Sequence, residues 1–334
     1  MTTTHSTLQL AGIHHVSAVS AHIARTHGFY TSVLGMRPVI KTVNQDDTSM
    51  YHLFFGDGIG SPGSDMTVFD IRGAARERRG NNSITRTNLR VAGEDTLEWW
   101  RARFAEMGVT HDAPTLCAGR RVLGFDDWEG TALALVDDGG AGEAFPWSES
   151  PVPPDRQIRG LGYTEITVPV HEPTDRFLVD VLGLRRERTH QASDSAEHTV
   201  HVYAIGGGGA HAEVHVIVRD DLPRARPGAG GVHHVALRVP EGQSMAAWVA
   251  RLDTAGYRNS GIVDRHYFTS AYVREPNHVL FELATDGPGF EVDSPLDADR
   301  LSLPPFLEPR RAEIEAKLQP LTSGATAVPA RMER

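Results

Sequence analysis

The stretch GVHHVALRVP, from Gly231 to Pro240, places two adjacent histidines at the start of an alternating run. A closely similar stretch, GIHHVSAVSA, runs from Gly12 to Ala21. Alternation with a period of two predicts a β-strand in both places. Because the same short pattern stands near both ends of the chain, we expect an internal repeat.

Three further pairs of segments support the repeat, and all share one offset of 148 residues. They are FYTSVLGMR (29–37) with FLVDVLGLR (177–185), RFAEMGV (103–109) with RLDTAGY (251–257), and NLRV (88–91) with ALRV (236–239). Short similarities are common by chance, but a shared offset is not. The sequence therefore predicts two homologous halves, 10–140 and 158–287.

Each half divides once more, because the pattern of a strand, a helix ending in glycine and several strands restarts within it. This predicts four βαβββ units, near 10–72, 82–138, 158–219 and 230–287. A Gly-, Pro- and Ser-rich segment, GAGEAFPWSESPVPPDRQ, joins the halves. A loop and a helix are expected at 301–322.

The composition is that of an ordinary globular protein of 334 residues, with a net charge of -10. This acidic balance argues against nucleic acid or an anionic membrane as a partner. The single cysteine, Cys117, allows no internal disulfide and fits a reducing cytoplasm. The N-terminal residues do not read as a secretory signal, and no apolar run is long enough to span a bilayer.

The four-unit architecture resembles the vicinal oxygen chelate superfamily, which contains glyoxalases, bleomycin-resistance proteins and type I extradiol dioxygenases. The resemblance covers nearly the whole chain. It implies an α+β fold in which paired βαβββ modules curl into two incomplete β-barrels, one of them around a metal ion.

The histidine pairs are kept in only two of the four units. When the repeats are aligned by the 148-residue offset, Thr85 and Arg86 correspond to His233 and His234. In the same alignment, Gly162 and Tyr163 correspond to His14 and His15. Ala134 likewise corresponds to Glu282, which lies inside the apolar run VLFEL. A carboxylate inside an apolar strand is costly to bury unless it is paired or bound to a cation. Units one and four therefore hold the candidate ligands.

Two imidazoles and one carboxylate form a facial triad that suits Fe(II) and leaves positions open for substrate and O2. We assign His15, His234 and Glu282 as the ligands. The choice of the second histidine in each pair is implied by the resemblance, since strand alternation shows only that one of each pair faces inward. His14 and His233 then lie beside the ligands. Because the ligands must converge, units one and four share the metal-binding barrel.

Asp70, in the run TVFDI, is a competing acid. It is expected to occupy in unit one the place that Glu282 holds in unit four. A fourth protein ligand there would resemble a glyoxalase I site. Because aspartate is one methylene shorter than the glutamate of glyoxalases, we expect that Asp70 is not a ligand.

The run DRHYFTSAYVREPNHVLFEL, from Asp264 to Leu283, predicts a hairpin whose turn is centred on Asn277. Tyr272 then lies directly opposite Glu282, so its hydroxyl faces the metal and can hydrogen-bond substrate or transfer a proton. Arg265 precedes Tyr272 by seven residues. An odd spacing does not keep one face of a regular strand, so alternation alone does not place this arginine.

The same run resembles a subgroup of ring-cleaving dioxygenases related to p-hydroquinone 1,2-dioxygenases. The segments GSPGSDMTVFD (60–70) and LPPFLEPRRAEIEAKLQPL (303–321) share the resemblance. It implies that Arg265 and Tyr272 line the substrate pocket. His278 departs from the pattern, which has a glycine more often at that position of the turn.

The resulting hypothesis is an extradiol-type, Fe(II)-dependent dioxygenase that opens a hydroquinone or catechol-type ring with O2, with Mn(II) as the alternative metal. Arg265 would supply positive charge, Tyr272 would orient the substrate oxygen and move a proton, and His233 would assist as a base. Two other functions are open: a glyoxalase-type metal-dependent isomerase or lyase, and a non-catalytic aromatic-binding protein. The ring substituents and the oligomeric state, a homo-oligomer included, are also open.

Overall fold

The computed structural model describes residues 8–192, 197–294 and 297–321. Its strands and helices follow the order strand, helix, three strands, four times over. The first two modules are β1 (Ile13–Ser20), α1 (Ile23–Gly28), β2 (Arg37–Val43), β3 (Tyr51–Gly56) and β4 (Asp65–Asp70), then β5 (Ser83–Val91), α2 (Glu94–Glu106), β6 (Thr115–Cys117), β7 (Arg120–Asp126) and β8 (Ala132–Asp137).

The last two modules repeat this order. They are β9 (Leu161–Val168), α3 (His171–Arg176), β10 (Arg185–Gln191), β11 (Thr199–Ala204) and β12 (Glu213–Val218), then β13 (Val232–Val239), α4 (Met245–Thr254), β14 (Val263–Asp264), β15 (Phe268–Arg274) and β16 (Leu280–Pro288). Short π-helical turns at Phe29–Val33 and Phe177–Val181 extend α1 and α3. The predicted α+β fold of four βαβββ modules is confirmed.

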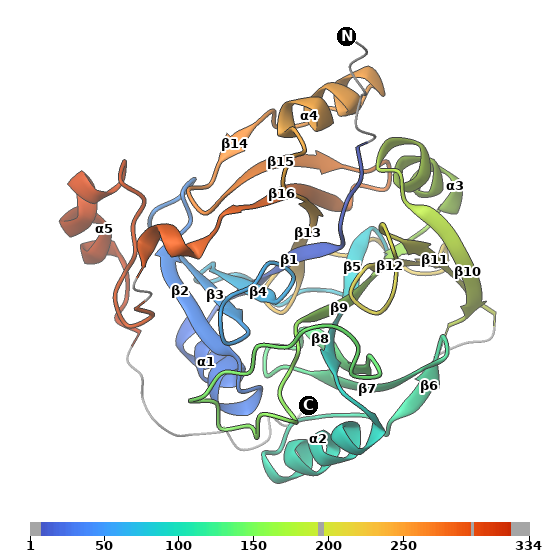
Figure 1. The fold of residues 1–334 in the computed structure, drawn as a ribbon, viewed down its shortest axis with the longest axis horizontal. Helices are drawn as coiled ribbons and strands as arrows, with labels where there is room; N and C mark the ends of the chain where they lie inside the picture. Colours follow the sequence, from blue (N-terminus) through green and yellow to red (C-terminus); the bar gives the residue numbers. More distant parts are fainter. Residues whose placement is uncertain (1–7, 193–196, 295–296, 322–334) are drawn as a thin grey trace.

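The modules pair as the converging ligands require. One eight-stranded sheet has the order β14-β15-β16-β13-β1-β4-β3-β2, so it contains modules four and one. The other has the order β10-β11-β12-β9-β5-β8-β7-β6, so it contains modules three and two. Figure 1 shows both sheets curling, with the helices on the outside. We call the interior of the first sheet the first cup and that of the second sheet the second cup.

Strand alternation separates the two faces of the first sheet. Val235 and Leu237 of β13 belong to the main apolar core, together with Trp248 of α4. Ala236, between them, packs in a smaller cluster on the other face. His234 shares the parity of Ala236, so the same alternation directs it into the first cup.

Local sequence features explain where α2 and α4 begin and where α2 ends. The helix α2 begins with two acidic residues in its first turn, which suits the positive end of the helix dipole. Just beyond its last turn, Gly108 adopts a φ of 69°, a left-handed conformation that favours glycine. Ser244 caps α4 by accepting a hydrogen bond from the amide of Ala247 at 3.3 Å.

Each predicted half, 10–140 and 158–287, contributes one module to each sheet. The division of the chain into domains at those limits stays a prediction. In the expected C-terminal segment 301–322, a 3-10 turn (Glu308–Arg310) leads into α5 (Arg311–Lys317), and residue 322 lies outside the described residues. A parallel bridge between Lys41 and Leu301 ties this segment to β2.

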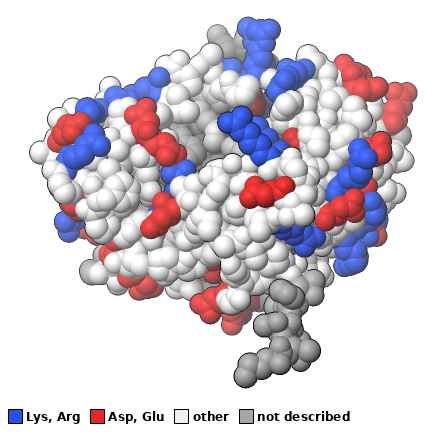
Figure 2. All heavy atoms as spheres, turned by 90° about the horizontal axis from the view of Figure 1, so that it is seen from above, with Lys and Arg blue, Asp and Glu red and all other residues white. Residues whose placement is uncertain are grey.

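The surface carries both signs of charge. Figure 2 shows acidic and basic side chains interspersed over the face seen from above, with no continuous basic stripe on that face. Among the described residues, no helix has the length and apolarity needed to cross a bilayer.

Candidate metal centre

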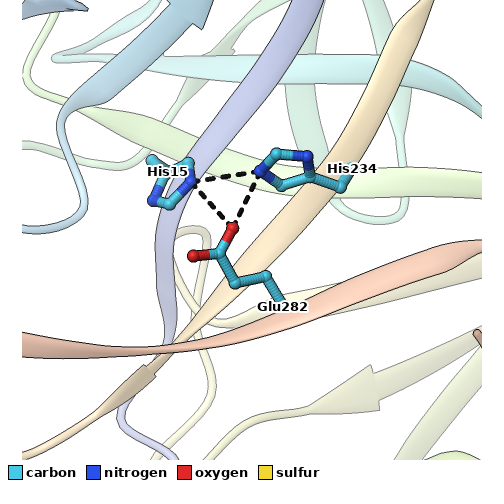
Figure 3. A group of neighbouring side chains, drawn as sticks. All are labelled: His15, His234 and Glu282. Atoms are coloured by element: carbon cyan, nitrogen blue, oxygen red, sulfur yellow. Dashed lines mark hydrogen bonds and ion pairs between the residues drawn. The ribbon is translucent and has the colours of Figure 1, made fainter. Parts of the chain in front are cut away.

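Three neighbouring strands of the first sheet, β1, β13 and β16, bring the three predicted ligands together. The His15 Nε2 and His234 Nε2 atoms lie 3.3 Å apart, and they lie 3.2 Å and 2.8 Å from Glu282 Oε2. Figure 3 shows the three side chains converging from separate strands. Within the described ranges, this is the one group of three such side chains close enough to share a metal ion.

The spacing and burial of the three donors fit a metal ion. Bonds of about 2.1 Å at right angles would place two donors about 3.0 Å apart, near the three observed separations. His15, His234 and Glu282 are 2%, 3% and 0% exposed. Buried Glu282 Oε2 makes no hydrogen bond of acceptable geometry, although two imidazoles lie beside it. An orphaned buried carboxylate oxygen facing two imidazole nitrogens is what a cation site requires.

Neighbouring groups keep Glu282 ionised. Burial raises the pKa of this carboxyl, but the adjacent His15 and His234 outweigh burial and hold the pKa well below its ordinary value. The second carboxylate oxygen, Oε1, accepts a short hydrogen bond from the Ser270 hydroxyl of β15. Ser270 therefore orients the carboxylate while Oε2 stays directed at the centre.

In each pair, the ring of the first histidine contacts the ring of the second one through their Nδ1 atoms. The His14 Nδ1 and His15 Nδ1 atoms lie 2.9 Å apart, and the His233 Nδ1 and His234 Nδ1 atoms lie 2.7 Å apart. Each contact leaves the Nε2 atom of the second histidine free to face the centre. Hydrogen bonds of this kind orient the imidazole ligands of metal sites. A shift of register between Ile13 and His15 in β1 interrupts regular alternation at the first pair.

Desolvation and an adjacent histidine lower the pKa of both outer histidines. Burial lowers the pKa of His14 to about 3, with the neighbouring His15 as the next cause. His233 is more exposed than His14, and partial desolvation, with the adjacent His234 as the next cause, lowers its pKa from the ordinary value. At neutral pH both imidazoles are therefore uncharged hydrogen-bond partners.

The predicted hairpin places Tyr272 and Arg265 at the same cup. Tyr272 pairs with Glu282 in the register of β15 and β16, and its ring lies 5.8 Å from that of His234. The Arg265 Nε atom donates to the Tyr272 hydroxyl at 3.1 Å. Burial, with the nearby charge of Glu282, raises the pKa of Tyr272 above its ordinary value. The hydroxyl therefore keeps its proton at neutral pH.

The structure also shows polar residues that the sequence reasoning missed. Ser17 Oγ lies 3.0 Å from His234 Nε2 and 2.7 Å from Thr67 Oγ1. Thr67 Oγ1 lies in turn 2.9 Å from His52 Nε2 of β3. Ser17 could have been found, since it stands two residues after His15 on the same strand face. The other two depend on strand pairing that is not local.

The position expected for Asp70 needs correction. In the parallel pair of β1 and β4, Ser17 pairs with Thr67, as Ala236 pairs with Glu282 in module four. Thr67, not Asp70, therefore occupies the place of Glu282 in module one. Asp70 pairs with Ser20 at the far end of the strand and is not in the three-residue group. The register decides this, because the run TVFDI alone does not show which residue lies opposite the cup.

The second cup replaces the ligands with a different set of polar groups. Ala134 of β8 stands at the place that Glu282 has in the first cup. A buried ion network is centred on Glu213, whose carboxylate accepts hydrogen bonds from Arg120, Arg188 and His215. Its charge is thus balanced by protein groups, as burial of a carboxylate requires.

Several known proteins are similar to this chain in sequence. A model described as the glyoxalase/bleomycin resistance protein/dioxygenase superfamily matches residues 160–283. The Bacillus subtilis protein "Putative ring-cleaving dioxygenase MhqA" is 46% identical over 317 residues, covering 94% of this chain and 100% of that protein. The "Chlorohydroquinone/hydroquinone 1,2-dioxygenase" of Sphingobium indicum is 29% identical and covers 82% of this chain and 85% of its own length.

Solved structures have a similar fold. A crystal structure of a "putative dioxygenase" from Bacillus subtilis superposes with a TM-score of 0.85 at 32% identity, covering 94% of this chain and 98% of that one. Glyoxalase I from Zea mays, at 14% identity and a TM-score of 0.62 over 82% of this chain and 92% of that one, shares the fold. The chain therefore belongs to the glyoxalase/bleomycin resistance protein/dioxygenase superfamily and, within it, to the ring-cleaving dioxygenases.

Proposed function

We propose that this protein is an Fe(II)-dependent dioxygenase that opens the ring of a hydroquinone with O2. The observation that carries the proposal is the buried group of His15, His234 and Glu282, whose donor atoms lie 2.8–3.3 Å apart. Tyr272 and Arg265 stand beside this group, where an aromatic diol would meet them. O2 is the second substrate, and both of its atoms enter the ring-opened product.

His15, His234 and Glu282 would hold the iron. Bound iron would supply open coordination positions and the electron transfer that joins the ring to O2. Mn(II) is the alternative metal, because the same donor types suit it. The protein contributes a fixed set of ligands, and Ser270 and the outer histidines limit how far these can rotate.

Tyr272 and Arg265 would handle the substrate. Because the Tyr272 hydroxyl keeps its proton, it can donate a hydrogen bond to a substrate oxygen or transfer a proton. The Arg265 guanidinium contacts the same hydroxyl and lies 5.2 Å from the centre of the Tyr272 ring. Its positive charge would stabilise negative charge that develops on the substrate during attack.

His14 and His233 would orient the ligands. The matching Nδ1 contacts in the two pairs support this role for both residues. The role of base predicted for His233 stays a prediction. Phe268 lies 5.1 Å and 5.2 Å from the His14 and His15 rings, and Phe69 lies 6.3 Å from that of His234. These aromatic side chains suit a flat apolar ring as substrate.

A hydroquinone is favoured over a catechol by similarity. The Sphingobium indicum relative is named for chlorohydroquinone and hydroquinone, and it aligns over 82% of this chain. The alternative isomerase or lyase of glyoxalase type needs a fourth protein ligand. Thr67 stands at the matching place in module one and offers a hydroxyl already bonded to Ser17. The alternative of a non-catalytic binding protein leaves the buried triad without a purpose.

We also propose a cytoplasmic location, which the lone Cys117 supports.

Anaerobic reconstitution with Fe(II), followed by oxygen uptake with hydroquinone, tests the proposal. We expect one O2 consumed per ring opened. His234→Ala should abolish both iron binding and uptake, whereas Asp70→Asn, a change outside the triad, should retain both. Iron-loaded protein that consumes no oxygen with any hydroquinone or catechol would refute the reaction class.

A further inference from the structure

A line of contacts leads from the buried carboxylate of the first cup to solvent. Glu282 is fully buried, and Tyr272 pairs with it across the hairpin. Arg265 contacts the Tyr272 hydroxyl and is 18% exposed, and Asp46 beyond it is 72% exposed. We call the exposed end of this line, formed by Arg265 and Asp46, the mouth of the first cup.

Two modules meet at the mouth. Asp46 lies in the loop between β2 and β3 of module one, and its carboxylate accepts hydrogen bonds from both terminal nitrogens of Arg265, at 2.9 Å and 3.2 Å. The preceding residue, Gln45, donates its side-chain amide to the Arg265 carbonyl oxygen at 2.9 Å. One short loop therefore holds Arg265 by its side chain and by its backbone.

The loop that carries Arg265 is itself constrained. His266 has a φ of 69°, a left-handed conformation that costs a non-glycine residue about 1 kcal/mol or more. Its amide donates to Asp264 Oδ1 at 2.8 Å, and its Nε2 atom lies 3.0 Å from Asp293 Oδ1. His266 thus contacts both of these carboxylates, and the carboxylate that pairs with Arg265 is that of Asp46.

The pairing with Asp46 offsets the positive charge of Arg265 on the side that faces solvent. Burial lowers the pKa of Arg265, but its hydrogen bond to Asp46 and the nearby Tyr272 outweigh burial, so the guanidinium stays charged. At the mouth, the Arg265 guanidinium and the Asp46 carboxylate together carry no net charge. An acidic ring substituent near the mouth would be attracted by Arg265 and repelled by Asp46.

We infer that Asp46 determines the charge selectivity of the first cup, so that the protein takes hydroquinones without an acidic ring substituent. Gln45 acts as a positioning residue that keeps Arg265 at the mouth. This inference rests on the proposed function, because it assumes that the ring enters beside Tyr272 and Arg265. It adds which substituents on that ring are accepted.

Two matched probes test the inference: 2,5-dihydroxybenzoate, which carries a carboxylate, and 2,5-dihydroxybenzamide, its neutral counterpart. Binding of each to the iron-loaded protein is measured by calorimetry without O2, so no turnover is needed. We expect the wild-type protein to favour the amide. Asp46→Asn leaves Arg265 unpaired and should shift the ratio of the two dissociation constants about tenfold toward the carboxylate. The shift should shrink at high salt.

Asp47→Asn is the matched control, because it makes the same charge change one residue away. The Asp47 carboxylate accepts hydrogen bonds from Ser49. Gln45→Leu should weaken both probes alike and leave their ratio unchanged. If the ratio of the two dissociation constants shifts equally in Asp46→Asn and Asp47→Asn, or shifts in neither, the inference is overturned and the proposed function still stands. Failure of both probes to bind any of the proteins would overturn the inference, whereas oxygen uptake with unsubstituted hydroquinone tests the proposed function separately.

Discussion

Glu282→Ala removes the one anionic ligand of the proposed centre and leaves both imidazoles in place. The wild-type carboxylate is 0% exposed, and its Oε2 atom lies 2.8 Å and 3.2 Å from the two imidazole nitrogens. A metal held by all three groups binds the folded protein and not the unfolded chain. Mn(II) should therefore raise the melting temperature of the wild-type protein, and Glu282→Ala should lose most of that increase.

The size of the effect follows from chain length. Metal at about a hundred times its dissociation constant stabilises the folded state by about 2.7 kcal/mol. The entropy of unfolding is about 2.1 cal/mol/K per residue, and the chain has 334 residues. A stabilisation of 1 kcal/mol therefore raises the melting temperature by about 1.4 °C. The wild-type shift should then be about 4 °C. A hundredfold loss of affinity in Glu282→Ala leaves about 0.4 kcal/mol, which corresponds to less than 1 °C.

Differential scanning calorimetry measures each shift against the same protein without metal, so any effect of the substitution on the metal-free fold cancels. Asp70→Asn is the matched control, because Asp70 is also a buried carboxylate of the first sheet, 2% exposed. It should keep the full shift. An unchanged shift in Glu282→Ala, or a shift lost in Asp70→Asn, would refute the assignment of the ligands.

Three further outcomes are expected. Tyr272→Phe removes the hydroxyl bonded to Arg265 and should lower kcat/KM for hydroquinone about a hundredfold, with the iron content unchanged by metal analysis. Burial raises the pKa of Asp127 from 3.8 to about 6, so the stability it contributes is present near pH 4 and lost as the pH rises through 6. Between pH 4 and pH 7, the free energy of unfolding of Asp127→Asn should therefore fall by about 2–3 kcal/mol less than that of the wild-type protein. Urea unfolding of both proteins at the two pH values measures the difference. Leu283→Ala, at a fully buried site, should cost about 2–5 kcal/mol in the same assay, whereas Leu116→Ala, 69% exposed, should change stability by less than about 0.5 kcal/mol.

Some of the first cup follows from local sequence patterns alone. Alternation with a period of two directs one histidine of each pair inward, and the 148-residue offset shows which modules keep the pair. The turn centred on Asn277 places Tyr272 opposite Glu282, and the strand register agrees. The hairpin prediction is confirmed because the pairing across a short turn depends on neighbouring residues, whereas a register shift in β1 interrupts the alternation predicted at the first histidine pair.

Other features were decided by the tertiary structure. Thr67 rather than Asp70 lies at the cup because the register of β1 and β4 depends on packing between segments about fifty residues apart. Arg265 reaches Tyr272 through a loop whose left-handed residue no alternation pattern predicts. Its pairing with Asp46 joins residues 219 positions apart. Sequence periodicity thus predicted the modules and limited the histidine ligands to one of each pair, and the family resemblance chose the second histidine. The contacts between modules were set by how the two ends of the chain pack together, since register and loop conformation depend on non-local pairing.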